Sequence, residues 1–348
     1  MSLGKHLAGV VALGLAAFAA AEEVSDWRLD LLKAEGIPTE TSSLQKLEKR
    51  FSVSNDLLSQ AVSRLGSEKF AAREQAQREI LLMGKDVLPL LQQGPQSEDP
   101  EVRQRLAAIQ RTLEAGGRWA KEDLIRKAVT SLLRERLKPN GAIAEPPLFV
   151  ELFRDPAPSL EKGYRRFRFE ADPGLLGSVS DGTLRLNGNH AGDGDQRLRL
   201  DAKSLTGKES FPDTFRIEVK LGGEAKGAGT YHVGVSIGNV RALFHPAYQG
   251  GGFRFQRVDN QKQLTENSSM GFDPAAGKLQ QMSLAVKRIP GGKVELEATI
   301  GNGDKVFTER KIFEESVIGK LDHLSLDRSG RNGGDGLFDD LIVDLGNH

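Results

Sequence analysis

The chain has 348 residues, which is enough for two ordinary domains. Its 48 Lys and Arg residues balance 48 Asp and Glu residues, so the net charge of zero gives no reason to expect nucleic acid or an anionic membrane as a partner. There is no cysteine, which excludes disulfides, thiolate nucleophiles and cysteine metal sites. The mean hydropathy of −0.39 indicates a globular chain, and no internal apolar run approaches the length of a membrane span.

Residues 1–21 have the pattern of a secretory signal peptide. Lys5 precedes an apolar stretch over residues 7–18, and small residues at the end of the segment offer cleavage sites. We therefore predict an exported protein, secreted or periplasmic, with no membrane span after cleavage. An uncleaved membrane anchor is the alternative, although the apolar run is short for a span.

Residues 22–138 have helical periodicity. Ser54 is a plausible N-cap, Gly66 lies where a C-cap glycine belongs, and Asp99-Pro100-Glu101 is a helix-start signal. Several short helices in succession predict an α-helical HEAT-like domain. Within it, roughly residues 54–115 resemble degenerate HEAT-like repeats. We expect this domain to act as a docking module. A short linker rich in Pro and Gly follows at residues 139–147.

From residue 148 to residue 348 the periodicity changes to two. Residues 215–221, 282–286 and 294–300 alternate apolar and polar side chains, and glycine-rich turns lie between such runs. Many short strands without a helical period predict an antiparallel β-sandwich. The expected fold class is therefore α + β with two domains, the helical one followed by the sandwich.

The stretch from residue 326 to residue 345 predicts two strands joined by a glycine-rich loop. Regular alternation in the second strand would place Leu341 on one face, and Phe338 and Ile342 together on the other. The same strand contains aspartates among its apolar residues. A buried carboxylate must be hydrogen-bonded, paired or metal-bound, because burying it bare is very costly.

The β half resembles a known fold family. The strand pattern from residue 215 to residue 343, ending in LFDDLIVDL, is similar to the concanavalin A-like jelly roll of laminin-G and legume-lectin type domains. More narrowly, LFHPAYQGGGFRFQR, MGFDPAAG and LDRSGRNGGDGLFDDLIVDL resemble an uncharacterised domain family of secreted bacterial proteins. These resemblances imply a jelly-roll sandwich and confer no activity.

One predicted strand, residues 231–237, has a nearly bare face. Its apolar face carries Tyr, Val and Ile, and small residues on the other face let a ligand or another backbone approach closely. Aromatic, amide and arginine side chains follow beside flexible glycines, and such groups hold sugar rings or peptides. The alternative is that the small residues relieve packing between sheets and that the histidine and tyrosine anchor a loop. The candidate ligand-binding residues are His232, Ser236, His245, Tyr248, Arg254 and Gln256.

The C-terminal oxygen donors are candidates for a Ca²⁺ site, because many laminin-G-like jelly rolls hold one such ion. Their spacing does not match an EF-hand loop. Arg328 and Arg331 lie in the same stretch and would instead pair with the aspartates, which is the competing interpretation. We favour the pairing interpretation and expect no cofactor, with Ca²⁺ at these donors as the alternative. The candidate donors are Asp327, Asn332, Asp335, Asp339 and Asp340.

Catalytic motifs give little support for an enzyme. The E-x-D-x-x-E motif of related glucan-cleaving jelly rolls does not occur, and neither does an H-E-x-x-H zinc motif or a G-x-x-x-x-G-K-[ST] phosphate loop. We therefore expect a non-catalytic protein that binds carbohydrate or a cell-envelope protein. The alternatives are a carbohydrate-active enzyme of the glycoside hydrolase type and a purely structural envelope component.

Overall fold

The structure is a computed structural model that describes most of the chain from residue 26 onward. The predicted signal peptide (1–21), the linker (139–147), Tyr248 and Asn332 lie outside the described residues. The described ranges are 26–51, 53–93, 97–115, 121–137, 148–188, 193–224, 231–246, 252–274, 277–302, 305–331 and 333–346.

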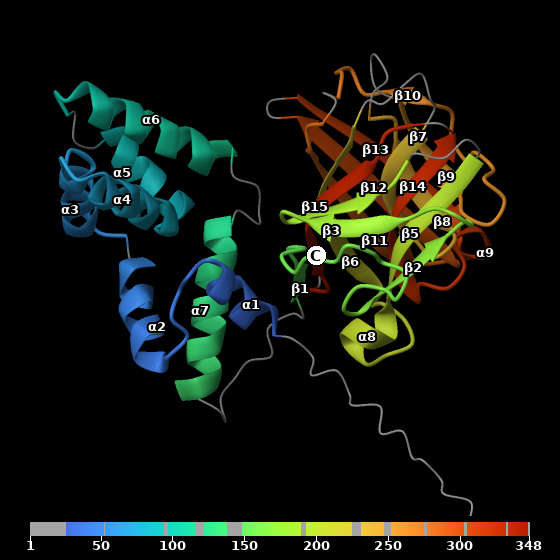
Figure 1. The fold of residues 1–348 in the computed structure, drawn as a ribbon, viewed down its shortest axis with the longest axis horizontal. Helices are drawn as coiled ribbons and strands as arrows, with labels where there is room; N and C mark the ends of the chain where they lie inside the picture. Colours follow the sequence, from blue (N-terminus) through green and yellow to red (C-terminus); the bar gives the residue numbers. More distant parts are fainter. Residues whose placement is uncertain are drawn as a thin grey trace, which may run out of the picture.

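The N-terminal part is helical, as expected (Figure 1). The predicted N-cap at Ser54 is confirmed, because its side chain accepts a hydrogen bond from the N–H of Leu57. None of the described helices combines the length and apolar character that a membrane span requires. The helices are α1 (Trp27–Ala34), α2 (Thr41–Glu48), α3 (Asn55–Leu65), α4 (Phe70–Leu82), α5 (Leu88–Gln93), α6 (Pro100–Ala115) and α7 (Lys121–Leu137), with short 3-10 helices at Lys49–Phe51 and Lys85–Val87.

The helices bury two separate apolar clusters. One cluster joins α3, α4 and α6, with Leu58, Ile80 and Ile109 among its buried residues. The other joins α1, α2 and α7, and it also contains Val150 and Ile342 from the β part. The helical part is therefore attached to the β part by apolar packing. HEAT-like repeats in the helical part stay a prediction.

The C-terminal part consists of two antiparallel sheets, which confirms the expected β-sandwich (Figure 1). Short helices α8 (Ala202–Thr206) and α9 (Glu315–Ile318) lie between strands. The first sheet has the order β13 (Lys305–Glu314), β12 (Lys293–Asn302), β11 (Gln280–Ile289), β6 (Thr214–Gly223), β15 (Gly336–Asp344), β4 (Thr183–Leu186) and β3 (Gly177–Ser180), with β1 (Leu148–Glu151) paired to β15. The second sheet has the order β10 (Ser268–Ser269), β9 (Gly252–Arg257), β8 (Val240–Phe244), β7 (Tyr231–Ile237), β14 (His323–Arg331), β5 (Asp193–Asp201) and β2 (Phe167–Ala171).

The strand β15 departs from the regular alternation that its sequence predicts. Its pairing with β6 shifts register between Asp339 and Ile342, and Asp340 has a φ of 47°. This bulge places Phe338 and Leu341 together in the core between the sheets, whereas Ile342 packs against the helices. The expectation that Phe338 and Ile342 share a face is therefore wrong, because an extra residue in the strand reverses the alternation after it.

The two faces of the sandwich have different surroundings. The apolar cluster of α1, α2 and α7 takes its β residues from β1, β15 and the residues next to β1, and the ion pair between Arg165 and Asp30, at 3.6 Å, adds a polar contact. Neither helical cluster contains a described residue of the second sheet. The helical clusters thus do not cover the outer side of the second sheet.

Candidate functional site

The second sheet places an unusual set of polar side chains on its outer side. Val233, Val235 and Ile237 of β7 point into the core, so His232, Gly234 and Ser236 face outward, as the alternation predicts. Pairing with the neighbouring strands brings further polar residues beside them. We call this set the polar face: Asp195, Arg197, His232, Ser236, Arg241, Arg254, Gln256, Ser325 and Asp327.

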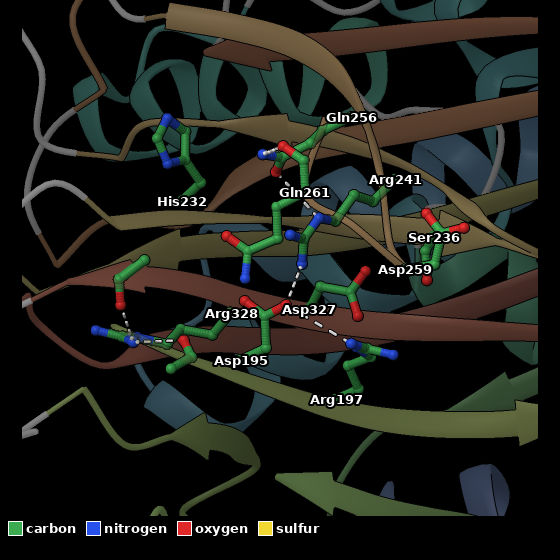
Figure 2. Close-up of polar contacts among 12 residues, drawn as sticks. Asp195, Arg197, His232, Ser236, Arg241, Gln256, Asp259, Gln261, Asp327 and Arg328 are labelled. Atoms are coloured by element: carbon green, nitrogen blue, oxygen red, sulfur yellow. Dashed lines mark hydrogen bonds and ion pairs between the residues drawn. The ribbon is translucent and has the colours of Figure 1, made fainter. Parts of the chain in front are cut away.

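A buried ion pair lies at the centre of the polar face. Arg241 of β8 has no exposed surface, and its Nη1 donates to Oδ2 of Asp195 at 2.9 Å (Figure 2). Its Nε donates to Oε1 of Gln256 at 3.1 Å. Within the described residues, Nη2 of Arg241 has no hydrogen-bond partner. The arginine therefore joins strands β9, β8 and β5 through contacts that solvent does not screen.

Gly234 leaves room for this arrangement. It lies on β7 between Leu243 of β8 and Asp327 of β14, and it has no side chain above the sheet. An added Cβ at Gly234 would lie 1.9 Å from the carbonyl oxygen of Ala242, so the neighbouring backbone requires a glycine here. The bare face predicted from the sequence is thus explained by the close approach of another strand.

Asp327 is held by a chain of hydroxyl groups. Its side chain is fully buried, and its Oδ1 accepts a hydrogen bond from Oγ of Ser325 at 2.9 Å. The hydroxyl of Ser325 also shares a hydrogen bond with that of Ser236. Burial raises the pKa of Asp327, while Arg197 and Arg241 oppose the shift. Its Oδ2 has no hydrogen-bond partner in the described part of the chain.

The sequence Gly234-Val235-Ser236-Ile237-Gly238 has the G-x-S-x-G pattern of a nucleophile elbow. In hydrolases this pattern forms a sharp turn between a strand and a helix. Here it lies along β7 and at its end, and the Ser236 hydroxyl is bonded to Ser325. Ser236 therefore belongs to the network that surrounds Asp327, and the local fold does not expose it as a nucleophile.

Two histidines and an arginine form one side of the polar face. The rings of His232 and His245 lie 5.3 Å apart, and Nη2 of Arg254 lies 3.5 Å from Nδ1 of His232. Burial, followed by the charge of Arg254, lowers the pKa of His232 to about 3. The same two causes lower the pKa of His245. Both imidazoles are therefore neutral near neutral pH.

The polar face retains positive charge. Arg197, Arg241 and Arg254 contribute three guanidinium groups against the two carboxylates of Asp195 and Asp327. Both carboxylates lie near Arg197 and Arg241. Arg254 is only partly buried, and within the described residues no carboxylate forms an ion pair with it. The positive charge of this side chain is thus not offset by a carboxylate among the described residues.

A turn after β9 adds an exposed amide. The backbone carbonyl of Gln261 accepts a hydrogen bond from Nε2 of Gln256 at 2.5 Å, and its φ is 56°. That left-handed conformation is unfavourable for a residue with a Cβ. The hydrogen bond from the Gln256 side chain to this backbone carbonyl helps to hold it. Figure 2 shows the Gln261 side chain on the same side of the sheet as Arg241. The amide is exposed to solvent.

The structure brings together those predicted binding residues that it describes. His232, Ser236, Arg254 and Gln256 share the polar face, and His245 lies beside His232. Tyr248 lies outside the described residues. Ser236 and Gln256 are buried in the hydrogen-bond network, so their contribution is to hold the site together.

The predicted calcium donors do not gather in the described residues. Asp327 belongs to the second sheet, whereas Asp339 and Asp340 lie on β15 of the first sheet, where Asp340 pairs with Nζ of Lys220 at 2.5 Å. Asp335 accepts a hydrogen bond from the N–H of Gly188 at 3.0 Å. No group of three or more metal-ligating His, Asp or Glu side chains occurs in the described ranges. Asn332 lies outside the described residues.

Arg328 has a different role from the one its position in the sequence suggests. It points into the sandwich, where its guanidinium lies 5.4 Å from the ring centroid of Tyr231 and donates to the carbonyl oxygen of Gly330 at 3.0 Å. It does not form an ion pair with Asp327, its neighbour in the sequence, because consecutive strand residues face opposite sides of a sheet.

Sequence reasoning did not identify Asp195, Arg197, Arg241 or Gln261 as site residues. Arg241 stands in the apolar run Val240–Phe244, where one charged residue is typical of a solvent-facing position. Asp195 and Gln261 come from segments with no pattern that links them to β7. Only the register of the strands shows that these residues meet.

Comparison with known proteins gives a likeness of fold. No protein-family model matches the chain, and no curated protein matches it. The solved structure of the Emp47p carbohydrate recognition domain is 11% identical, has a TM-score of 0.36, and covers 60% of this chain and 100% of that chain. Lectin II from Ulex europaeus is 13% identical with a TM-score of 0.39, over 57% of this chain and 97% of that chain.

A structure of the alginate lyase Aly36B with an alginate trisaccharide is similar to the same extent. It is 9% identical with a TM-score of 0.39, and covers 59% of this chain and 100% of that chain. The similar structures thus include lectin-type carbohydrate-binding domains and an alginate lyase. At these identities and TM-scores, the likeness carries no argument about the activity of this chain.

Proposed function

We propose that the protein binds carbohydrate at the polar face and does not transform it. The observation that carries this proposal is a set of polar groups held in fixed positions on the outer side of the second sheet, where Arg254 and Gln261 keep accessible surface. Arg254 and Gln261 offer a guanidinium and an amide to a ligand, and the buried contacts of Arg241 and Gln256 hold the strand and turn that carry them. Sugar recognition needs several oriented donors and acceptors of this kind.

We further propose that the protein works outside the cytoplasm, because residues 1–21 match a secretory signal peptide. The helical part would then act as the docking module toward a cell-envelope partner. The packing of α1, α2 and α7 on the side of β1 and β15 supports this division of roles, because these helices do not cover the outer side of the second sheet.

A polysaccharide-binding measurement tests the proposed site. The chain without its first 21 residues should bind at least one member of a polysaccharide array saturably. We expect Gln261→Ala to weaken this binding about three- to tenfold, because a neutral hydrogen bond contributes roughly 1 kcal/mol. Gln263→Ala is the matched control, because Gln263 belongs to the same turn and its amide donates to Asn267 at 3.4 Å.

The outcomes separate the site from its alternatives. Equal affinities of the two glutamine variants would place binding elsewhere on the molecule. Release of reducing ends from the bound polysaccharide would contradict the non-catalytic part of the proposal. No binding on the whole array would overturn the proposal and favour a purely structural component or a protein partner.

A further inference from the structure

Arg254 of β9 has no ion-pair partner among the described residues. Its side chain is about half-buried, its Nε has no hydrogen-bond partner among the described residues, and burial together with the charge of Arg241 lowers its pKa. A partly desolvated cation beside another cation destabilises the folded state. Such a group is a candidate for a binding role, because functional sites are where unfavourable charges are retained.

The surroundings of Arg254 favour an anion. The imidazole of His232 lies against it and stays neutral, so it does not compensate the positive charge. The other two guanidiniums of the polar face lie near Asp195 and Asp327. A negatively charged group at Arg254 would therefore complete the charge balance of the site.

We propose that Arg254 binds the carboxylate of a sugar acid, so that the ligand of the polar face is a uronate-containing polysaccharide. The inference rests on the proposed function, which supplies the sugar, and it adds the charge class of that sugar. The planar fork of a guanidinium matches a carboxylate through two parallel hydrogen bonds. The exposed amide of Gln261, on the same side of the sheet, can accept from and donate to the hydroxyl groups of the same ligand.

Acidic polymers and their neutral counterparts give the direct test. Polygalacturonate and polyglucuronate are each compared with the same polymer after reduction of its carboxyl groups to alcohols, and dextran sulfate is the third arm. We expect saturable binding of at least one uronate polymer and at least tenfold weaker binding of its reduced form, because charge-assisted hydrogen bonds are about twice as strong as neutral ones. Dextran sulfate should bind more weakly than the uronate polymer.

Two variants of Arg254 locate the effect. Arg254→Gln should lower the affinity for the uronate polymer at least tenfold, to about that of the reduced polymer. Arg254→Lys keeps the positive charge and loses the two parallel donors of the guanidinium. Its affinity for the uronate polymer should therefore lie between those of wild type and Arg254→Gln. Arg168→Gln is the matched control: it removes a guanidinium from the same side of the sheet, at the other edge, where Arg168 pairs with Asp201 at 2.9 Å.

The melting temperature of Arg254→Gln distinguishes a binding role from a structural one. We expect it to be unchanged or raised, because the substitution removes a charge that no carboxylate among the described residues offsets. A large fall in melting temperature would overturn the inference that Arg254 is retained for binding.

The remaining outcomes distinguish this inference from the function on which it rests. Equal affinity for acidic and reduced polymers, or equal affinity for the uronate polymer and dextran sulfate, would overturn the carboxylate and leave carbohydrate binding standing. Binding of neutral polysaccharides alone would do the same. The absence of binding to every polymer, acidic and neutral, would overturn both.

Discussion

Replacing Arg241 by methionine is expected to lower the free energy of unfolding by about 3 to 5 kcal/mol. The substitution removes the 2.9 Å ion pair with Asp195 and the hydrogen bond to Gln256. It also leaves two buried carboxyl groups, Asp195 and Asp327, with one guanidinium fewer nearby. The penalty is large because an uncompensated buried charge cannot recover its hydration.

Urea denaturation of wild type and Arg241→Met measures this loss. The comparison requires that the unfolding free energy of both proteins depends on urea concentration with the same slope. Arg288→Met is the control, because Arg288 pairs with the exposed Asp213 at 3.0 Å and the exposed Glu315 at 3.1 Å, and each such pair contributes between zero and about 1 kcal/mol. The double variant Arg241→Met with Asp195→Leu should recover part of the stability, because it removes both charges together. A loss below about 1 kcal/mol for Arg241→Met would show that the buried pair does not hold the polar face together.

The contrast between Arg241 and Arg254 is the basis for separating structure from function on this face. Arg241 is fully buried, paired and central, so its loss should affect folding. Arg254 lies on the adjacent strand, is only partly buried, and has no carboxylate partner in the described residues. The two arginines lie on the same side of one sheet, and yet we expect substitution of Arg241 to lower stability and substitution of Arg254 not to lower it.

The sequence predicts the fold better than it predicts the site. Strands such as 215–221 and 294–300 were identified because one side of each sheet must be apolar, which leaves a period of two in the sequence. The same rule identified His232 and Ser236 as outward-facing. It fails at Asp340, because the bulge there changes the face of every following residue without changing the composition of the strand.

The sequence pattern fails to identify the remaining site residues for a different reason. The pairing of Arg241 with Asp195 joins two strands that are 46 positions apart in the chain, and neither residue stands in a local motif. Gln261 takes part through a turn whose left-handed backbone conformation no single residue type announces. Long-range register decides which polar residues of a sheet meet, and alternation alone does not contain that information.

Acid is expected to destabilise the protein through His232. Its pKa is about 3 in the folded state, against 6.5 for an ordinary histidine, because it is buried next to Arg254 and near His245 and Arg241. Between these two values only the unfolded state takes up a proton, so stability rises with pH in this window and is lost as the pH falls through it. From about pH 7 to about pH 4 the loss due to His232 is about 3 kcal/mol, since each pH unit below 6.5 contributes about 1.4 kcal/mol.

The variant His232→Gln isolates this contribution, because glutamine does not titrate. Urea denaturation at about pH 7 and about pH 4 should show that wild type loses about 3 kcal/mol more than the variant. Asp327 and Asp339 have raised pKa values, so as the pH falls the folded state takes up their protons before the unfolded state does. Their protonation therefore opposes the loss of stability that His232 causes. Both remain in the variant, and so does His245, so their effects cancel to first order in the comparison. Parallel pH dependences of the two proteins would mean that His232 is protonated in the folded state, and the neutral imidazole assigned to the site would then be wrong.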